Sequence, residues 1–108
     1  MSLSRRVVLL AGVLTVGLVP AAHAGPRVVK AKDFLFKPGK VTIKRGSIVK
    51  WRFLDASAHN VVSRGTRRFR SSQDMRSGTY RVRFRKRGRY RYVCTIHPLS
   101  MGGVVTVR

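Results

Sequence analysis

The chain has 108 residues, of which 24 are lysine or arginine and three are acidic, so its formal net charge is +21. This length allows one domain. A single cysteine excludes an internal disulfide and any metal centre built on two cysteines, and three aspartates scattered along the chain offer no carboxylate pair for acid–base catalysis.

The N-terminal segment 1–24 has the pattern of a secretory signal peptide. Arg5 and Arg6 precede an apolar run at 7–19, and Ala-His-Ala at 22–24 is a small-x-small cleavage site. The run is short for a membrane span, which needs about 20 residues; an uncleaved membrane anchor is the alternative interpretation. The paired arginines also resemble a twin-arginine export signal, a route for domains that fold before export.

The predicted mature chain, 25–108, is a small basic domain outside the cytoplasm, periplasmic or secreted, with no transmembrane segment. Without Arg5 and Arg6 it keeps 22 basic residues against three aspartates, a charge of +19 on 84 residues. A domain of this size buries a modest core and often needs a covalent or metal staple. Cys94 is therefore a buried small side chain, a partner in an intermolecular disulfide, or a metal ligand.

Strand patterns recur along this domain, with glycine and proline between them and no helical periodicity of useful length. In chain order, the predicted strands lie in the segments 27–36, 40–46, 47–55, 59–63, 78–88, 89–94 and 103–108. Their alternating apolar positions include Val41, Ile43, Ile48, Trp51, Phe53, Tyr80, Val82 and Phe84. Seven or eight short strands separated by turn residues predict an all-β sandwich or barrel.

Side-chain parity indicates where the cysteine points. Tyr90, Tyr92 and Cys94 fall on one face of the segment 89–94, because side chains alternate along a strand. We expect the thiol to point inward at the end of a strand, and residues 97–101 to form a loop at one end of the sandwich. A loop held between two strands can direct several side chains at one point.

Four residues form a candidate copper site: His59, Cys94, His97 and Met101. Thiolate, imidazole and thioether donors suit copper in both oxidation states, and two histidines and one cysteine with a weak axial methionine define blue-copper centres. Taken singly, each residue has a simpler explanation, as a buried cysteine, a surface histidine or a core methionine. A structural zinc site is another interpretation, although two cysteines would then be expected.

At these residues the chain resembles the cupredoxins, the small blue copper proteins that include plastocyanin, amicyanin and pseudoazurin. The segments that carry the resemblance are FKPGKVTIKRGSIVKWRFLDASAHNVVS and SGTYRVRFRKRGRYRYVCTIHPLSMGGVVTV. The resemblance implies a Greek-key β-sandwich with one type 1 copper ion at one end. It makes His59, Cys94 and His97 the strong ligands and Met101 the axial ligand.

The resemblance also implies a hydrogen-bonded link between the ligand loops, from Asn60 to the vicinity of Thr95; an ordinary turn role for Asn60 is the alternative. Two features depart from the family pattern. Three residues separate His97 from Met101, where amicyanin-like loops have two and plastocyanin-like loops have four, and Ile96 replaces a common proline.

The charge predicts an anionic partner. Basic residues are densest at 81–91, and like charges this dense repel one another. We expect a monomer that meets an acidic redox partner protein or an anionic surface of the cell envelope. Nucleic acid is disfavoured as a partner, because Tyr80, Phe84 and Tyr90 fall on the inward face and cannot stack on bases, and because the signal peptide exports the chain.

Together these features predict a small exported type 1 copper protein that transfers single electrons by Cu(I)/Cu(II) cycling. The imidazole edge of His97, flanked by Pro98 and Leu99, is the predicted electron exit. The protein would be an electron carrier and not an enzyme, since no nucleophile or acid–base pair is evident. The alternative is a periplasmic copper carrier or resistance protein with the same ligands and no electron-transfer role.

Overall fold

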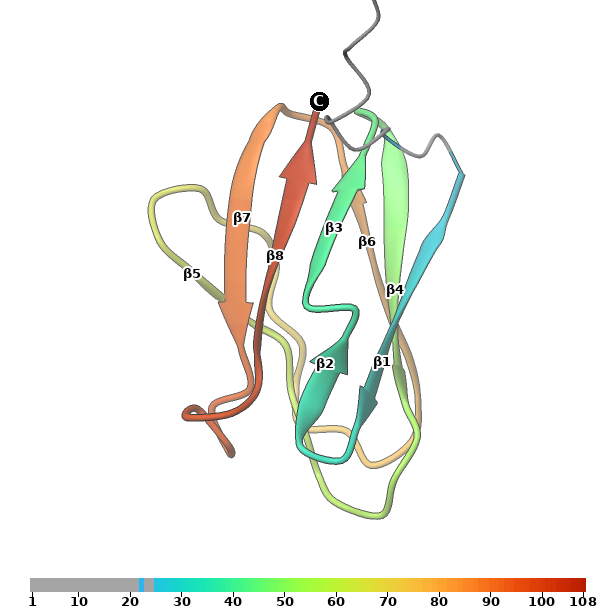
Figure 1. Ribbon diagram of the computed structural model, residues 1–108, viewed down its shortest axis with the longest axis vertical. Helices are drawn as coiled ribbons and strands as arrows, with labels where there is room; N and C mark the ends of the chain where they lie inside the picture. The colour runs from blue at the N-terminus through green and yellow to red at the C-terminus, as the bar shows by residue number, and fades with distance from the viewer. Residues whose placement is uncertain (1–21, 23–24) are drawn as a thin grey trace, which may run out of the picture.

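The computed structural model describes Ala22 and residues 25–108, which form a sandwich of two four-stranded sheets (Figure 1). The strands are β1 (Arg27–Lys32), β2 (Leu35–Lys37), β3 (Lys40–Ile43), β4 (Ser47–Phe53), β5 (Val62–Arg64), β6 (Gly78–Phe84), β7 (Gly88–Val93) and β8 (Gly102–Val107). The predicted all-β sandwich is confirmed. The predicted signal peptide lies outside the described residues, apart from Ala22. In the described part of the chain, no helix is long and apolar enough to cross a membrane.

The strand order brings distant segments to the same end of the molecule. The sheets have the orders β2-β1-β4-β6 and β3-β8-β7-β5. The pairs β1–β4 and β3–β8 are parallel, and the other pairs are antiparallel. The turn between β1 and β2 and the loops after β4 and β7 therefore lie together at the end drawn at the bottom of Figure 1. We call this the metal end.

Side-chain alternation builds the core between the sheets. The buried apolar and aromatic residues of the strands are Val29, Ala31, Phe36, Val49, Trp51, Phe53 and Phe84 in the first sheet and Val41, Ile43, Tyr90, Tyr92, Val105 and Val107 in the second. Tyr90 and Tyr92 face inward as predicted. Ile48 does not share the inward face of β4 and lies half-buried on its outer face. Side chains alternate along the strand, so Val49, two residues before Trp51, shares the inward face with Trp51.

The segment 27–36, predicted as one strand, is divided by a tight turn. Asp33 and Phe34 adopt positive φ angles of 56° and 60°, which is the backbone conformation of a two-residue hairpin turn. The chain therefore reverses between β1 and β2. This reversal places Asp33 and Phe34 at the metal end.

The predicted strand 59–63 is shorter than expected, since β5 begins only at Val62. His59 instead forms an isolated bridge with Met75. The His59 N–H donates to the Met75 carbonyl at 2.9 Å, and the Met75 N–H donates back at 2.7 Å. The backbone of this histidine is thus fixed by a segment outside the two sheets.

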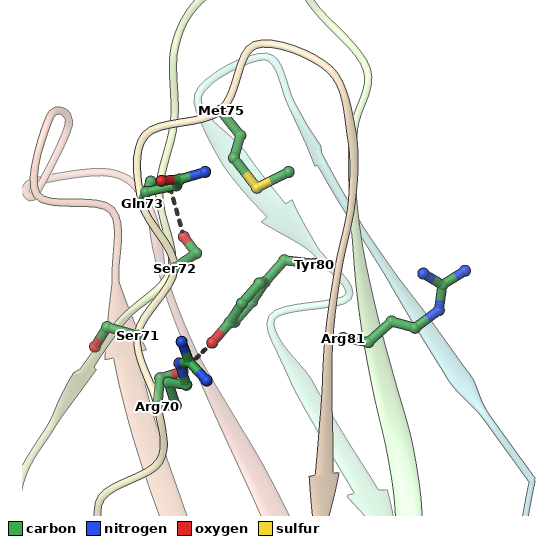
Figure 2. A pocket seen from close by; sticks show the side chains of 7 residues that line it. All are labelled: Arg70, Ser71, Ser72, Gln73, Met75, Tyr80 and Arg81. Carbon is green, nitrogen blue, oxygen red and sulfur yellow. Dashed lines mark hydrogen bonds between the residues drawn. The ribbon is translucent and has the colours of Figure 1, made fainter.

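The connection between β5 and β6 closes one side of the core. Its Phe69 ring stacks on Trp51 with the ring centroids 5.7 Å apart. A hollow of about 490 Å³ lies beside this connection, and Figure 2 shows the Met75 and Tyr80 side chains among those that line it. Because Met75 also pairs with His59, the same connection supports both the core and the metal end.

Candidate metal centre

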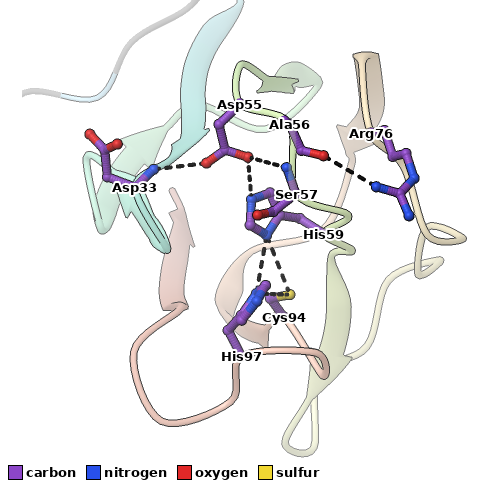
Figure 3. Close-up of polar contacts among 8 residues, drawn as sticks. All are labelled: Asp33, Asp55, Ala56, Ser57, His59, Arg76, Cys94 and His97. Carbon is purple, nitrogen blue, oxygen red and sulfur yellow. Dashed lines mark hydrogen bonds and ion pairs between the residues drawn. The ribbon is translucent and has the colours of Figure 1, made fainter.

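The predicted donors converge at the metal end (Figure 3). His59 lies between β4 and β5, while Cys94 and His97 follow β7. The two histidine Nδ1 atoms are 3.2 Å apart, and Cys94 Sγ lies 4.0 Å from Nδ1 of His59 and 3.7 Å from Nδ1 of His97. All three candidate ligand atoms lie within 4.8 Å of one another. Two loops that are distant in the sequence thus present three donors to one point.

These spacings fit one copper ion. In a trigonal centre, bonds of about 2.0 Å to nitrogen and about 2.3 Å to sulfur separate two nitrogens by about 3.5 Å and nitrogen from sulfur by about 3.7 Å. His59 and Cys94 are fully buried and His97 is half-buried, so the fold shields two of the three donors from bulk water and leaves the third partly exposed. Two imidazoles and one thiolate in this arrangement are the strong donors of blue-copper centres.

The loop from Cys94 to Met101 is closed by its own backbone. The Cys94 N–H donates to the Met101 carbonyl at 2.9 Å, and the Met101 N–H donates to the His97 carbonyl at 3.0 Å. The His97 N–H donates to the Cys94 carbonyl at 3.2 Å. Met101 is fully buried. With three residues between His97 and Met101, the loop therefore brings Met101 back beside Cys94.

Asn60 ties the two ligand loops together. Its side-chain amide donates to Thr95 Oγ1 at 2.8 Å and to Asp74 Oδ1 at 2.9 Å, and its side-chain oxygen accepts the Thr95 N–H at 2.8 Å. The predicted link from Asn60 to Thr95 is confirmed. Asp74 is a third member that sequence reasoning missed, because its contact depends on the path of the long connection before β6.

Asp55 orients the first histidine, and sequence reasoning also missed it. Its Oδ1 lies 2.8 Å from His59 Nε2 and accepts the Ser57 N–H at 3.1 Å, while Oδ2 accepts the Asp33 N–H at 3.0 Å (Figure 3). Burial raises the pKa of this carboxyl, but the hydrogen bonds from His59 and the two backbone N–H groups hold it below its ordinary value. An ionised carboxylate only accepts hydrogen bonds, so Nε2 carries the proton and Nδ1 is left for a metal.

An apolar rim of Phe34, Ile96 and Leu99 lies beside His97. The Phe34 and His97 rings meet edge to face with their centroids 4.6 Å apart. Leu99 is fully exposed, and Phe34 is 46% exposed. Sequence reasoning identified Leu99 but missed Phe34, which approaches the site only through the hairpin turn between β1 and β2.

The fold and this donor set define a cupredoxin. Residues 26–108 match the model of the copper binding proteins of the plastocyanin/azurin family. The chain therefore belongs to that family, and copper is its cofactor. The predicted resemblance to cupredoxins is confirmed.

Among its relatives, the chain is similar to amicyanins. It is 38% identical over 91 residues to amicyanin-alpha of Methylorubrum extorquens, which covers 81% of this chain and 76% of that protein. The oxidized state of an amicyanin variant matches with 29% identity and a TM-score of 0.68, over 77% of this chain and 82% of that one. A copper-containing nitrite reductase from Thermus scotoductus matches 88% of this chain with 25% identity and a TM-score of 0.66, but only 25% of the reductase is covered.

Proposed function

We propose that this protein is an exported type 1 copper electron carrier, with His59, Cys94 and His97 as the strong ligands and Met101 as the axial ligand. The observation that carries the proposal is the convergence of two imidazole Nδ1 atoms and one thiol within 4.8 Å. Membership of a copper-binding family and similarity to amicyanins support it. Bound copper would supply a one-electron couple between Cu(I) and Cu(II).

Residues other than the four proposed ligands hold this site in shape. Asp55 orients His59, Asn60 joins the two ligand loops, and the backbone bonds of the Cys94 loop hold its shape. Donors held in this way move little when the charge at their centre changes by one unit. A small rearrangement suits fast electron exchange better than it suits catalysis on a substrate.

The proposed route for the electron is the imidazole of His97. It is the one strong donor that is half-exposed, and the exposed side chains of the apolar rim offer an apolar surface near it to a partner protein. The chain has 24 basic and three acidic residues, and this positive net charge favours a partner of negative charge. We propose an acidic redox protein outside the cytoplasm as this partner, with the carrier acting as a monomer.

The visible spectrum tests the copper site. Addition of Cu(II) should produce an intense charge-transfer band from sulfur to copper. Cys94→Ser should abolish the band while the cooperative unfolding transition persists, because serine keeps the volume but not the thiolate. A retained band in this variant would rule out Cys94 as the ligand.

Voltammetry distinguishes an electron-transfer function from a copper-transport function. Reversible one-electron exchange at an electrode is expected for the proposed function. A coloured protein without reversible exchange would indicate copper transport or storage. Binding of zinc in preference to copper, with no colour after Cu(II) addition, would indicate a structural site.

A further inference from the structure

An open hollow of about 410 Å³ lies on the outer surface of the second sheet, and none of the proposed metal ligands lines it. It is lined by Arg64, Gly65, Thr66, Arg89 and Arg91. The arginines of β7 face outward there because they alternate with buried tyrosines. Its lining residues come from β7 and from β5 with the turn after it, and in Figure 1 β5 and the yellow loop that follows lie beside β7.

The register brings three guanidinium-bearing residues to one place. Arg64 pairs directly with Arg91 across β5 and β7, and Arg89 lies two residues away on the same face. Like charges directly opposite each other on a sheet are destabilising. The arrangement is therefore a cost to the fold unless an anion occupies the hollow.

Among the described residues, no aspartate lines the hollow. Each of the chain's three aspartates is engaged elsewhere: Asp55 with His59, Asp74 with Asn60, and Asp33 in an exposed ion pair with Lys37. In the described residues 25–108, no aspartate forms an ion pair with Arg64, Arg89 or Arg91.

The turn beside the hollow is fixed by an arginine that does not line it. Arg68 donates from Nε to the Gly65 carbonyl at 2.7 Å and from Nη1 to the Ser63 carbonyl at 3.3 Å. Gly65 has a φ of 86°, and a side chain there would contact the Arg91 guanidinium. Glycine thus provides the turn and leaves the Arg91 side chain uncovered.

We propose that this hollow binds a phosphate group, either as inorganic phosphate or as the phosphate of a lipid headgroup. Guanidinium groups match phosphate oxygens in paired hydrogen bonds, and the Thr66 hydroxyl adds a further donor. Inorganic phosphate carries about 1.5–2 negative charges near pH 7, more than one carboxylate, which suits three cations. The phosphodiester of a lipid headgroup carries one negative charge. A water molecule occupies about 30 Å³, so the hollow has room for a phosphate and several waters.

The bound phosphate leaves the metal end free. Arg91 and Arg89 are three and five residues before Cys94 on β7, which corresponds to about 10 and 17 Å along a strand. A carrier held at a phosphate-bearing surface through this hollow would still present His97 to a redox partner. The proposed phosphate site shares no residue with the metal site. Phosphate binding and copper binding can therefore be measured separately in the same protein.

The test uses the copper-loaded protein in its Cu(I) form at low ionic strength, titrated with inorganic phosphate and followed by calorimetry and by NMR of the arginine Nε–H groups. Arg89→Gln with Arg91→Gln removes two of the three guanidiniums. Arg81→Gln with Arg83→Gln is the matched control, since it removes the same charge from β6 in the opposite sheet. We expect the pocket variant to bind phosphate at least about tenfold more weakly than wild type and the control to bind within about twofold of wild type. The Cu(II) charge-transfer band, recorded before reduction to Cu(I), and the melting temperature check that both variants fold.

A second arm identifies the source of the phosphate. Vesicles of phosphatidylglycerol and phosphatidylcholine are sedimented with each variant. If the pocket variant binds vesicles more weakly than the control variant does, the proposal is supported and the ligand is the lipid headgroup. If both variants bind vesicles equally, while the pocket variant binds free phosphate more weakly than the control, the ligand is the soluble anion. Equal losses of phosphate affinity in both variants would overturn the proposal, because the effect would then be general charge. Tighter binding of polyglutamate than of phosphate at the hollow would overturn it in favour of an acidic protein.

Discussion

His59 is fixed from several directions by residues that are not ligands. Its backbone pairs with Met75, its Nε2 meets Asp55, and the following Asn60 is held by Thr95. A histidine with this many constraints cannot rotate without breaking hydrogen bonds, so its Nδ1 stays directed at Cys94. Partners of this kind set the geometry and affinity of metal sites.

Replacement of Asp55 should loosen this histidine. Asp55→Ala removes the acceptor for His59 and for two backbone N–H groups, and we expect a loss of about 1–3 kcal/mol in the free energy of unfolding and a loss of about 10- to 100-fold in copper affinity. Denaturant titration and competition with a chelator measure the two effects. Asp55→Asn should lose less, because its side-chain oxygen can still accept from His59.

Asp33→Asn is the matched control for this prediction. The Asp33 carboxylate forms an exposed ion pair with Lys37 at 3.9 Å, and exposed ion pairs contribute about 0–1 kcal/mol. This variant should keep the copper affinity of the wild type. Unchanged copper affinity in Asp55→Ala as well would show that the carboxylate does not position His59.

At the scale of the elements, β7 and β8 connect the core to the ligand loop. Tyr92 of β7 pairs with Gly103 of β8, and Cys94 and Met101 continue these two strands. The Tyr92 ring is buried against Trp51, with ring centroids 5.2 Å apart. The position of the ring leaves no space for a side chain at residue 103.

Gly103→Ala should therefore destabilise the fold. A Cβ at this position would overlap the hydroxyl and a ring carbon of Tyr92 and approach the Gly39 carbonyl to 3.0 Å. We expect a loss of about 1–3 kcal/mol, the usual cost of overpacking, measured by denaturant titration. Gly102→Ala is the control, since its nearest neighbour would be the Tyr92 carbonyl at 3.6 Å. Equal stability of the two variants would mean that Tyr92 does not occupy this space.

The stabilisation that the Tyr80 hydroxyl gives to the connection before β6 can be tested by its dependence on pH. The Tyr80 hydroxyl donates to the Arg70 carbonyl, and burial raises the pKa of Tyr80 above its ordinary value of 10.0. The proton is held more tightly in the folded state, so this stabilisation is present below about pH 10 and is lost as the pH rises through the raised pKa. Tyr80→Phe should cost about 1 kcal/mol at neutral pH, and the difference from wild type should shrink above pH 10. A constant difference across this range would contradict the assignment.

The whole molecule has an uneven charge distribution. The three aspartates all contact residues of the metal end or of the β1–β2 hairpin, while 24 basic residues are spread over the chain. The outer face of the first sheet carries cross-strand pairs of like charge, such as Lys50 with Arg81 and Lys30 with Arg52. The folded state therefore carries electrostatic self-repulsion that salt should relieve.

Salt should stabilise the copper-loaded protein. Raising potassium chloride from about 0.01 M to about 1 M shortens the Debye length from about 30 Å to about 3 Å. We expect the melting temperature to rise by about 5–10 °C, since 1 kcal/mol corresponds to about 4–8 °C in a domain of this size. Lys50→Gln with Arg81→Gln should melt higher at low salt and respond less. A melting temperature that is flat or falls with salt would contradict net repulsion.

The sequence by itself determined the all-β sandwich, the inward cysteine, the donor set of the candidate site and the sign of the charge. These features depend on local alternation, on residue chemistry and on composition, all of which can be read along one strand or one loop. Only the tertiary structure decided that Asp55 meets His59, that Asp74 joins Asn60, and that Phe34 packs on His97. Each of these contacts depends on which loops meet at the metal end. The pairing of strands that are far apart in the chain and the turn at Asp33 decide which loops meet there, and neither can be read from the contacting residues alone.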